Sequence, residues 1–230
     1  LIVTNKKENI DHYKNVILTN NFNESYNQII NELYFHEDLI DFKDDLDLNN
    51  GSYISKFSSI DESVNIGKNC FIGRGVKIGK NCIIKNNVVI KNSIIRDNVI
   101  IGDNTTIGSS GFGFPFDNRG VKNLNPHIGI VFINNNCRIG SNCTIDRGKI
   151  DYTYLGKNCM LDNLIHLGHN VEIGDNACVA AQSGVSGSTI IGNNFTSGGQ
   201  SGFAGHIKVG NNVIVAAKSG VTKNIKDNST

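Results

Sequence analysis

Two histidines and an aspartate lie close together in the stretch DNLIHLGHN, residues 162–170. The chain has only six histidines, and it places His166 and His169 three residues apart, with Asp162 just upstream. A neutral imidazole with an ordinary pKa of about 6.5 can take a proton from an attacking group near neutral pH. A carboxylate can orient the imidazole and stabilise its protonated form. The stretch therefore suits general-base chemistry if the fold brings these side chains together.

The spacing of aliphatic residues predicts the element that carries this stretch. From Ile60 to Ile90 every sixth residue is Ile, and the spacing of six returns in three later registers. These are Ile95, Ile101 and Ile107; Ile133, Ile139 and Ile145; and Leu155, Leu161, Leu167, Ile173, Val179, Val185, Ile191, Ser197, Phe203, Val209, Val215 and Val221. This period is typical of a hexapeptide β-helix. We expect a mainly β protein in which three hexads form one triangular coil around an aliphatic core.

The cysteines follow the same period. Cys70, Cys82, Cys137, Cys143 and Cys159 each lie two positions before an inward aliphatic residue, in a second inward position. We interpret them as small buried side chains rather than disulfide partners. Because none of the six cysteines forms a CxxC pair, we expect no metal site.

Composition and charge exclude several classes of protein. The formal net charge is +1, which gives no electrostatic reason to expect a nucleic-acid partner. The sequence contains no apolar run of membrane-spanning length and no signal-peptide pattern. We therefore expect a cytoplasmic protein with no integral membrane segment.

Two parts of the chain leave the period of six. Residues 1–52 read as a partial α/β segment followed by an acidic connector, and 53–230 as the β-helix domain with an extended loop at 109–127. The expected helical face consists of Phe22, Tyr26, Ile29, Ile30 and Leu33. A long loop that leaves a solenoid is more often functional than decorative. The chain opens on LIVT without a starting Met, so we expect it to begin inside a domain.

Four motifs carry a resemblance to a known family. They are GSSGFGF, IGSNCTIDRG, LDNLIHLGHNVEIGDNACVAA and SGFAGHIKVG, in this order within residues 53–225. This stretch resembles the UDP-3-O-acylglucosamine N-acyltransferases of lipid A biosynthesis. The resemblance implies a left-handed parallel β-helix, a homotrimer and active sites in clefts between subunits. It also implies that residues 1–52 are part of a uridine-binding domain.

The resemblance also implies roles for individual residues. His169 matches the catalytic base, Asp162 the carboxylate near that base, and His206 a second active-site histidine. Gly187 matches the residue whose backbone N–H faces the developing oxyanion. The residues expected to bind substrate are Asn163, Phe112, Phe114 and His166. Since His166 has no fixed counterpart in the family and should point outward, it either lines the cleft or is solvated.

The expected activity is transfer of a (3-hydroxy)acyl chain from a thioester donor to the 2-amino group of a UDP-3-O-acyl-glucosamine. We expect no tightly bound cofactor, and acyl carrier protein or coenzyme A as the acyl donor. Four lysines fall in residues 208–230 and would favour the acidic carrier protein. One alternative is a coenzyme A-dependent N-acetyl- or N-acyltransferase that acts on another nucleotide-linked amino sugar. The other is a β-helix scaffold without catalysis.

Overall fold

The computed structural model describes residues 2–4, 16–34, 46–114, 119–122 and 126–230. Parts of the expected connector and of the loop at 109–127 lie outside these residues. By their contacts the residues group into two compact units: Leu1–Ile40 with Phe112–Pro126, and Asp41–Gly111 with His127–Thr230. The loop therefore groups with the N-terminal segment, and the division falls earlier than the boundary expected at residue 52.

The first unit contains the small α/β segment that the sequence predicts. Strands β1 (Ile2–Thr4) and β2 (Val16–Leu18) pair in parallel, and helix α1 spans Phe22–Tyr34. Asn21 caps the helix, because its Oδ1 accepts the backbone N–H of Glu24 at 3.3 Å. The hydroxyl of Tyr26 donates to the carbonyl of Pro126 at 3.1 Å, which ties the end of the loop to the helix.

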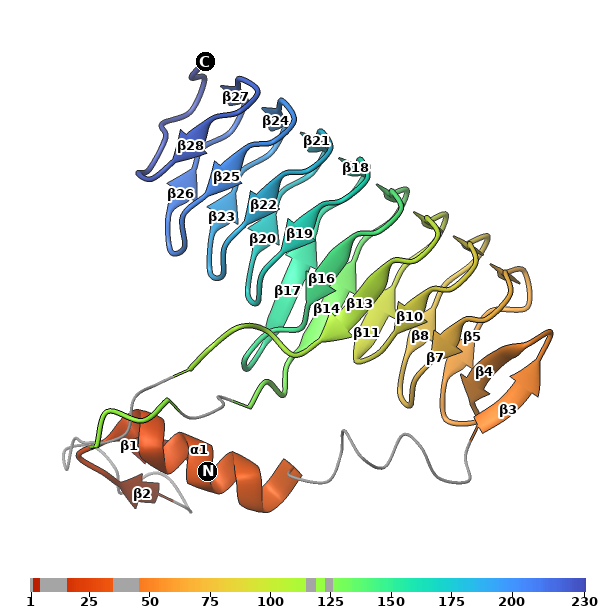
Figure 1. Cartoon of the computed structure of the whole chain (residues 1–230), viewed down its shortest axis with the longest axis horizontal. Helices are drawn as coiled ribbons and strands as arrows, with labels where there is room; N and C mark the ends of the chain where they lie inside the picture. Colours follow the sequence, from red (N-terminus) through yellow and green to blue (C-terminus); the bar gives the residue numbers. More distant parts are fainter. Residues whose placement is uncertain (1, 5–15, 35–45, 115–118, 123–125) are drawn as a thin grey trace. The chain divides into compact units, whose positions relative to one another are not determined.

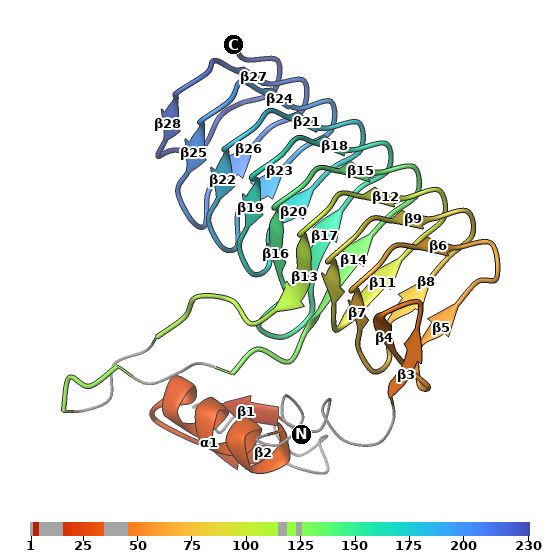
Figure 2. The ribbon, with the colours of Figure 1, turned by 45° about the vertical axis from the view of Figure 1, so that its right-hand side comes forward.

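The second unit is a parallel β-helix made of three sheets (Figures 1 and 2). The ten-stranded sheet contains β3 (Leu46–Asn49), β4 (Ser52–Ser55), β7 (Phe71–Ile72), β10 (Val89–Ile90), β13 (Thr106–Ser109), β16 (Thr144–Asp146), β19 (His166–Leu167), β22 (Gly184–Val185), β25 (Gly202–Phe203) and β28 (Gly220–Val221). One eight-stranded sheet contains β5 (Ser59–Ile60), β8 (Lys77–Ile78), β11 (Ser93–Ile95), β14 (Ile130–Ile133), β17 (Tyr152–Leu155), β20 (Glu172–Ile173), β23 (Ile190–Ile191) and β26 (Lys208–Val209). The other contains β6 (Asn65–Ile66), β9 (Ile83–Ile84), β12 (Ile100–Ile101), β15 (Arg138–Ile139), β18 (Met160–Leu161), β21 (Cys178–Val179), β24 (Thr196–Ser197) and β27 (Ile214–Val215). This arrangement confirms the predicted solenoid.

The hexad explains the core. In most of the short strands the second residue is buried and the first faces outward, as in Glu172 and Ile173 of β20. The aliphatic residues of the period of six therefore form one continuous core, which includes Ile72, Ile101 and Leu167. Five cysteines are buried in it as predicted. Burial raises the pKa of the Cys82 and Cys143 thiols, so they remain protonated and unreactive near neutral pH.

Asparagine makes the corners. At the corner before each strand of the β6–β27 sheet from β9 onward, a single Asn adopts a left-handed backbone conformation, such as Asn158 with φ 57° and Asn176 with φ 61°. Asparagine tolerates this conformation better than most residues. The side-chain amides also bond from coil to coil, with Asn158 Nδ2 donating to Asn176 Oδ1 at 3.1 Å and Asn176 Nδ2 to Asn194 Oδ1 at 3.0 Å.

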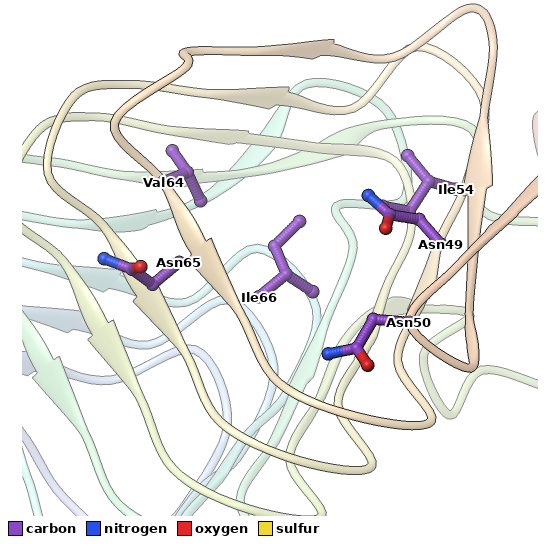
Figure 3. A pocket seen from close by; sticks show the side chains of 6 residues that line it. All are labelled: Asn49, Asn50, Ile54, Val64, Asn65 and Ile66. Atoms are coloured by element: carbon purple, nitrogen blue, oxygen red, sulfur yellow. The ribbon is translucent and has the colours of Figure 1, made fainter.

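A hollow of about 290 Å³ opens at the first coil (Figure 3). Its lining consists of Asn49, Asn50, Ile54, Val64, Asn65 and Ile66. Ile54, Val64 and Ile66 are only partly buried and pack against the end of the core. The hollow is thus the start of the solenoid interior.

Candidate active site

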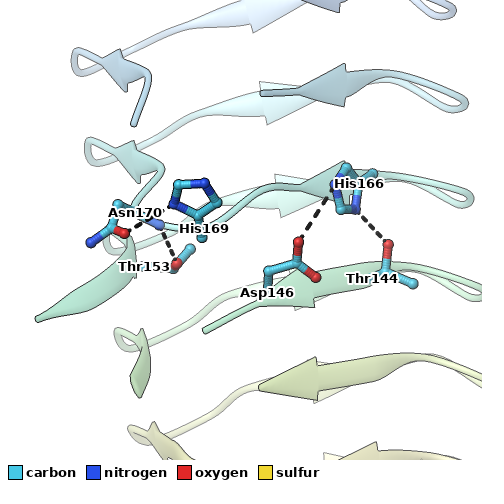
Figure 4. A network of polar contacts seen from close by, with 6 residues as sticks. All are labelled: Thr144, Asp146, Thr153, His166, His169 and Asn170. Carbon is cyan, nitrogen blue, oxygen red and sulfur yellow. Dashed lines mark hydrogen bonds and ion pairs between the residues drawn. The ribbon is translucent and has the colours of Figure 1, made fainter. Parts of the chain in front are cut away.

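His169 lies at the corner between β19 and β20 (Figure 4). Its Nδ1 is 3.1 Å from Asn170 Oδ1. That oxygen also accepts the backbone N–H of Lys149 at 2.8 Å, so it acts as the acceptor toward both groups. Nδ1 of His169 must then carry the proton, which leaves the lone pair on Nε2. Thr153 Oγ1 accepts the backbone N–H of Asn170 at 2.8 Å and fixes the residue that orients the ring.

Two glycines contact the His169 side chain because neither carries a side chain of its own. A Cβ placed on Gly187 would lie 2.7 Å from His169 Nε2, and one on Gly111 would lie 2.7 Å from His169 Cβ. The Gly187 carbonyl accepts the backbone N–H of His206 at 3.1 Å. The Gly187 N–H donates to no acceptor in the described part of the chain. Gly187 therefore lies against His169 Nε2 and has a backbone N–H without an acceptor among the described residues.

His206 lies at the same corner, one coil beyond Gly187. It has a left-handed backbone with φ 61°, as have Asn170 and Ser188 on the two preceding coils. Its side chain is exposed. The structure thus brings His169, Gly187 and His206 to one corner of the prism.

His166 and Asp146 form a second pair beside His169 (Figure 4). His166 Nε2 is 3.8 Å from Asp146 Oδ2, and His166 Nδ1 is 2.7 Å from Thr144 Oγ1. The His166 side chain is 49% exposed, whereas that of Asp146 is 12% exposed. Burial raises the pKa of Asp146, although His166 and His169 partly offset this by their charge. His166 therefore points outward as expected, with a carboxylate that the sequence analysis did not identify.

Residues on both sides of the long loop complete this region. The His127 ring packs against that of His169 at a centroid distance of 5.0 Å and an interplanar angle of 61°. Arg147 is buried, and its Nε–H donates to the carbonyl of Gly129 at 2.6 Å. Burial lowers the pKa of the Lys149 ammonium, which belongs to the same strand connection.

Sequence reasoning missed Asp146, His127 and Gly111. Asp146 lies in the motif IGSNCTIDRG, but a regular coil of 18 residues does not align it with a histidine. Residues 147–151 lengthen the coil, so that Thr144 and His166 pair across 22 positions. His127 and Gly111 come from the ends of the long loop, where the repeat is interrupted.

Asp162 and Asn163 lie at a different corner of the same chain. They follow β18 and precede β19, and both are exposed. Asp162 Oδ1 accepts the N–H of Asn163 at 2.8 Å, and Asn163 Oδ1 accepts that of Ser141 at 2.8 Å. Together they line a hollow of about 370 Å³ with Arg138, Gly140, Met160, Leu161, Cys178, Val179 and Ala180. A single chain therefore does not bring Asp162 to His169, contrary to the pairing suggested by their closeness in sequence.

Phe112 and Phe114 belong to the first compact unit and not to the β-helix unit. Their rings meet edge to face at 4.8 Å, and Phe112 is 84% exposed. Their expected role in substrate binding stays a prediction.

The residues that the structure describes contain no group of three or more His, Cys, Asp or Glu side chains that could hold a metal ion. They also contain no helix that is both long and apolar enough to cross a membrane.

Family models match three stretches of the chain. The model described as bacterial transferase hexapeptide (six repeats) matches residues 152–187, and the hexapeptide repeat of succinyl-transferase matches 130–168. A third, the GMPPB C-terminal domain, matches residues 54–114. The chain therefore contains hexapeptide repeats similar to those of bacterial transferases, in agreement with the three-sheet solenoid.

Curated relatives narrow the class. The chain is 48% identical over 82 residues to a UDP-3-O-acylglucosamine N-acyltransferase of Dechloromonas aromatica, covering 36% of this chain and 23% of the relative. It is 49% identical over 81 residues to the enzyme of the same name from Rickettsia typhi, covering 35% of this chain and 23% of the relative. The chain is thus homologous to these N-acyltransferases over about a third of its length, which confirms the resemblance seen in its motifs. The match spans about a quarter of those relatives.

Solved structures agree on the fold. A UDP-N-acetylglucosamine acyltransferase from Francisella novicida superposes with a TM-score of 0.70 at 25% identity, covering 76% of this chain and 63% of that one. A UDP-N-acetylglucosamine O-acyltransferase from Moraxella catarrhalis superposes with a TM-score of 0.64 at 25% identity, covering 76% of this chain and 67% of that one.

Proposed function

We propose that this protein transfers an acyl chain from a thioester to the 2-amino group of a UDP-linked 3-O-acyl-glucosamine in the cytoplasm, as a step of lipid A biosynthesis. The observation that carries the proposal is the closeness of His169 Nε2, which bears the lone pair, to Gly187, whose N–H has no acceptor among the described residues. This is a base and a hydrogen-bond donor on adjoining coils. The relatives named for this activity supply the substrate class.

The geometry supports a direct attack of the amine on the thioester carbonyl. His169 Nε2 takes a proton from the nitrogen as the bond to carbon forms, and general-base help of this kind is worth about 10²–10⁴-fold. The Gly187 N–H donates to the oxygen as it becomes negative. When the tetrahedral intermediate collapses, the thiolate leaves and receives the proton held by His169. Asn170 accepts from Nδ1 throughout, so the ring keeps its orientation.

The proposed active form is a homotrimer. In one chain the hollow beside Asp162 and Asn163 and the corner of His169 lie on different sides of the coil. Packing three prisms side by side would let the Asp162 corner of one copy face the His169 corner of the next. The acceptor would then bind between two copies, with Asp162 near the base as the family resemblance implies.

The proposed acyl donor is acyl carrier protein, and coenzyme A is the alternative. Of the four C-terminal lysines, Lys208 lies on β26, and Lys223 and Lys226 flank the bridge of Ile225 to Val209. Lys218 lies at another corner, before β28. Three lysines near the sheet of β26 could attract an acidic carrier protein through charge. The proposal therefore relies on these three and not on Lys218.

A product assay tests the proposal. The protein is incubated with UDP-3-O-acyl-glucosamine or with UDP-N-acetylglucosamine, each with acyl carrier protein or coenzyme A thioesters of 3-hydroxyacyl chains. We expect an amide-linked acyl product from the free amine and none from the N-acetyl sugar. An ester product from the N-acetyl sugar would instead indicate the chemistry of the structural neighbours. The absence of product from every pair would favour a scaffold.

A further inference from the structure

Asp146 carries a largely buried carboxylate to which no group of the described residues donates a hydrogen bond. The residue is 8% exposed, and among the described residues its only polar contact is His166 Nε2 at 3.8 Å. A buried ionised carboxylate that lacks donors costs stability, so such groups usually have a bound or catalytic partner. Asp146 lies between the rings of His166 and His169 (Figure 4). The Asp146 carboxylate can therefore accept a hydrogen bond from a group of the bound substrate.

N-acylation raises a proton problem that His169 alone does not solve. An amine with a pKa of about 8 reaches the enzyme mostly as an ammonium ion at neutral pH. An ammonium ion has no lone pair, so it must lose one proton before attack and a second one during attack. His169 takes the second proton and returns it to the leaving thiolate. The first proton must leave the site by another route.

We propose that Asp146 binds the ammonium form of the acceptor and removes its first proton, and that His166 passes this proton to solvent. The inference rests on the proposed N-acyltransferase function and deepens it. It assigns Asp146 and His166 to amine activation, and His169 to the acyl transfer itself.

The steps balance in atoms and charge. The ammonium gives a proton to the Asp146 carboxylate, which leaves a neutral amine and a neutral carboxylic acid. Asp146 passes the proton to Nε2 of neutral His166, whose Nδ1–H donates to Thr144 Oγ1. The imidazolium then releases the proton to water. The 3.8 Å gap is longer than a hydrogen bond, so the Asp146 side chain must turn toward the ring or one water must bridge them. Overall, ammonium and thioester give amide, thiol and one proton.

The environment of each residue fits its role. The raised pKa of Asp146 makes its carboxylate a better proton acceptor than an exposed aspartate. His166 is half exposed and so reaches water, while Thr144 holds its Nδ1. The charged and titratable groups around Asp146 are His166 and His169, with Arg147 next in the chain and His127 against the His169 ring. Arg147 directs its Nε–H to Gly129.

The pH dependence of kcat/KM for the acceptor tests this relay. At pH 6.5 an amine with a pKa of about 8 is roughly 3% neutral. An Asp146→Asn enzyme that can use only this fraction should be about 30-fold slower than the wild type at pH 6.5. The difference should vanish above pH 9, where the free amine predominates. His166→Gln should show the same trend, because Asp146 can then no longer pass its proton to an imidazole.

Glu172→Gln serves as the control, since Glu172 is an exposed carboxylate on β20. Its kcat/KM should match the wild type at every pH, and circular dichroism should show all variants folded. A loss in Asp146→Asn that is equal at all pH values, or no loss at pH 6.5, would overturn the relay. An inactive wild type would instead refute the proposed function.

Discussion

His169 can serve as a base because Asn170 fixes where its proton lies. The amide oxygen accepts from both His169 Nδ1 and the Lys149 backbone, so the ring cannot present Nδ1 to substrate. Asn170 also has a left-handed φ of 57°, which an alanine would adopt at a cost.

Two substitutions at Asn170 separate these effects. Asn170→Ala and Asn170→Gly both remove the acceptor, and each should lower kcat by about 10-fold because the ring loses its orientation. Only Asn170→Ala should also lose about 1 kcal/mol of stability from backbone strain, as measured by urea unfolding. Wild-type kcat in the glycine variant would show that Asn170 does not orient His169.

Gly187 should tolerate no side chain. An added Cβ would lie 2.7 Å from His169 Nε2 and 2.9 Å from Cε1, so the ring must move. We expect Gly187→Ala to reduce kcat by about 100-fold through loss of base and oxyanion geometry. Gly220→Ala is the control, because a Cβ there meets nothing within 4 Å and should leave kcat unchanged. A fully active Gly187→Ala enzyme would place the reaction elsewhere.

Asp146 should cost the protein stability at neutral pH. Burial raises the pKa of Asp146 in the folded protein. The ionised carboxylate therefore destabilises the fold once the pH exceeds the pKa of Asp146 in the unfolded chain. Asp146→Asn should therefore raise Tm at pH 7 by at least about 2 °C. The gain should shrink as the pH falls through about 4 and should vanish at lower pH, where the carboxyl group is protonated in both states. A lower Tm at pH 7 would contradict this account of burial and show that the folded protein stabilises the ionised carboxylate.

At the scale of the strands and corners, the sequence predicts the regular elements well. Each hexad needs only an aliphatic residue, a small inward residue and a corner that accepts a left-handed backbone, and all three are visible in single residues. The pairing of His166 with Asp146 could not be found this way. It depends on residues 147–151, which lengthen this coil, and a period of six does not show which residues an insertion brings opposite each other.

The asparagine corners supply stability as well as shape. Asn176 accepts from Asn158 and donates to Asn194 through its amide, at a φ of 61°. Asn176→Ala should destabilise the protein by about 2 kcal/mol, from lost hydrogen bonds and left-handed strain. Asn176→Gly should cost less, since glycine adopts this backbone freely. Equal losses in chemical unfolding would show that the backbone conformation contributes nothing.

For the whole molecule, the proposed active site requires that chains associate. The Asp162 corner and the His169 corner of one chain lie apart, so a cleft that uses both needs a second copy. Multi-angle light scattering should give about three times the 25.0 kDa chain mass at micromolar concentration. A stable monomer with full activity would remove Asp162 from the mechanism. Salt dependence distinguishes the two acyl donors: the affinity for a carrier protein should fall steeply with added salt, whereas that for coenzyme A should respond less.

The most direct test of the central claim compares His169→Ala with the wild type in amide formation from UDP-3-O-acyl-glucosamine and a 3-hydroxyacyl thioester. Product is quantified by mass spectrometry under saturating substrates. We predict that kcat falls by about 100-fold or more while the circular dichroism spectrum and Tm stay unchanged. A kcat within a few-fold of the wild type would contradict the assignment of this corner as the active site.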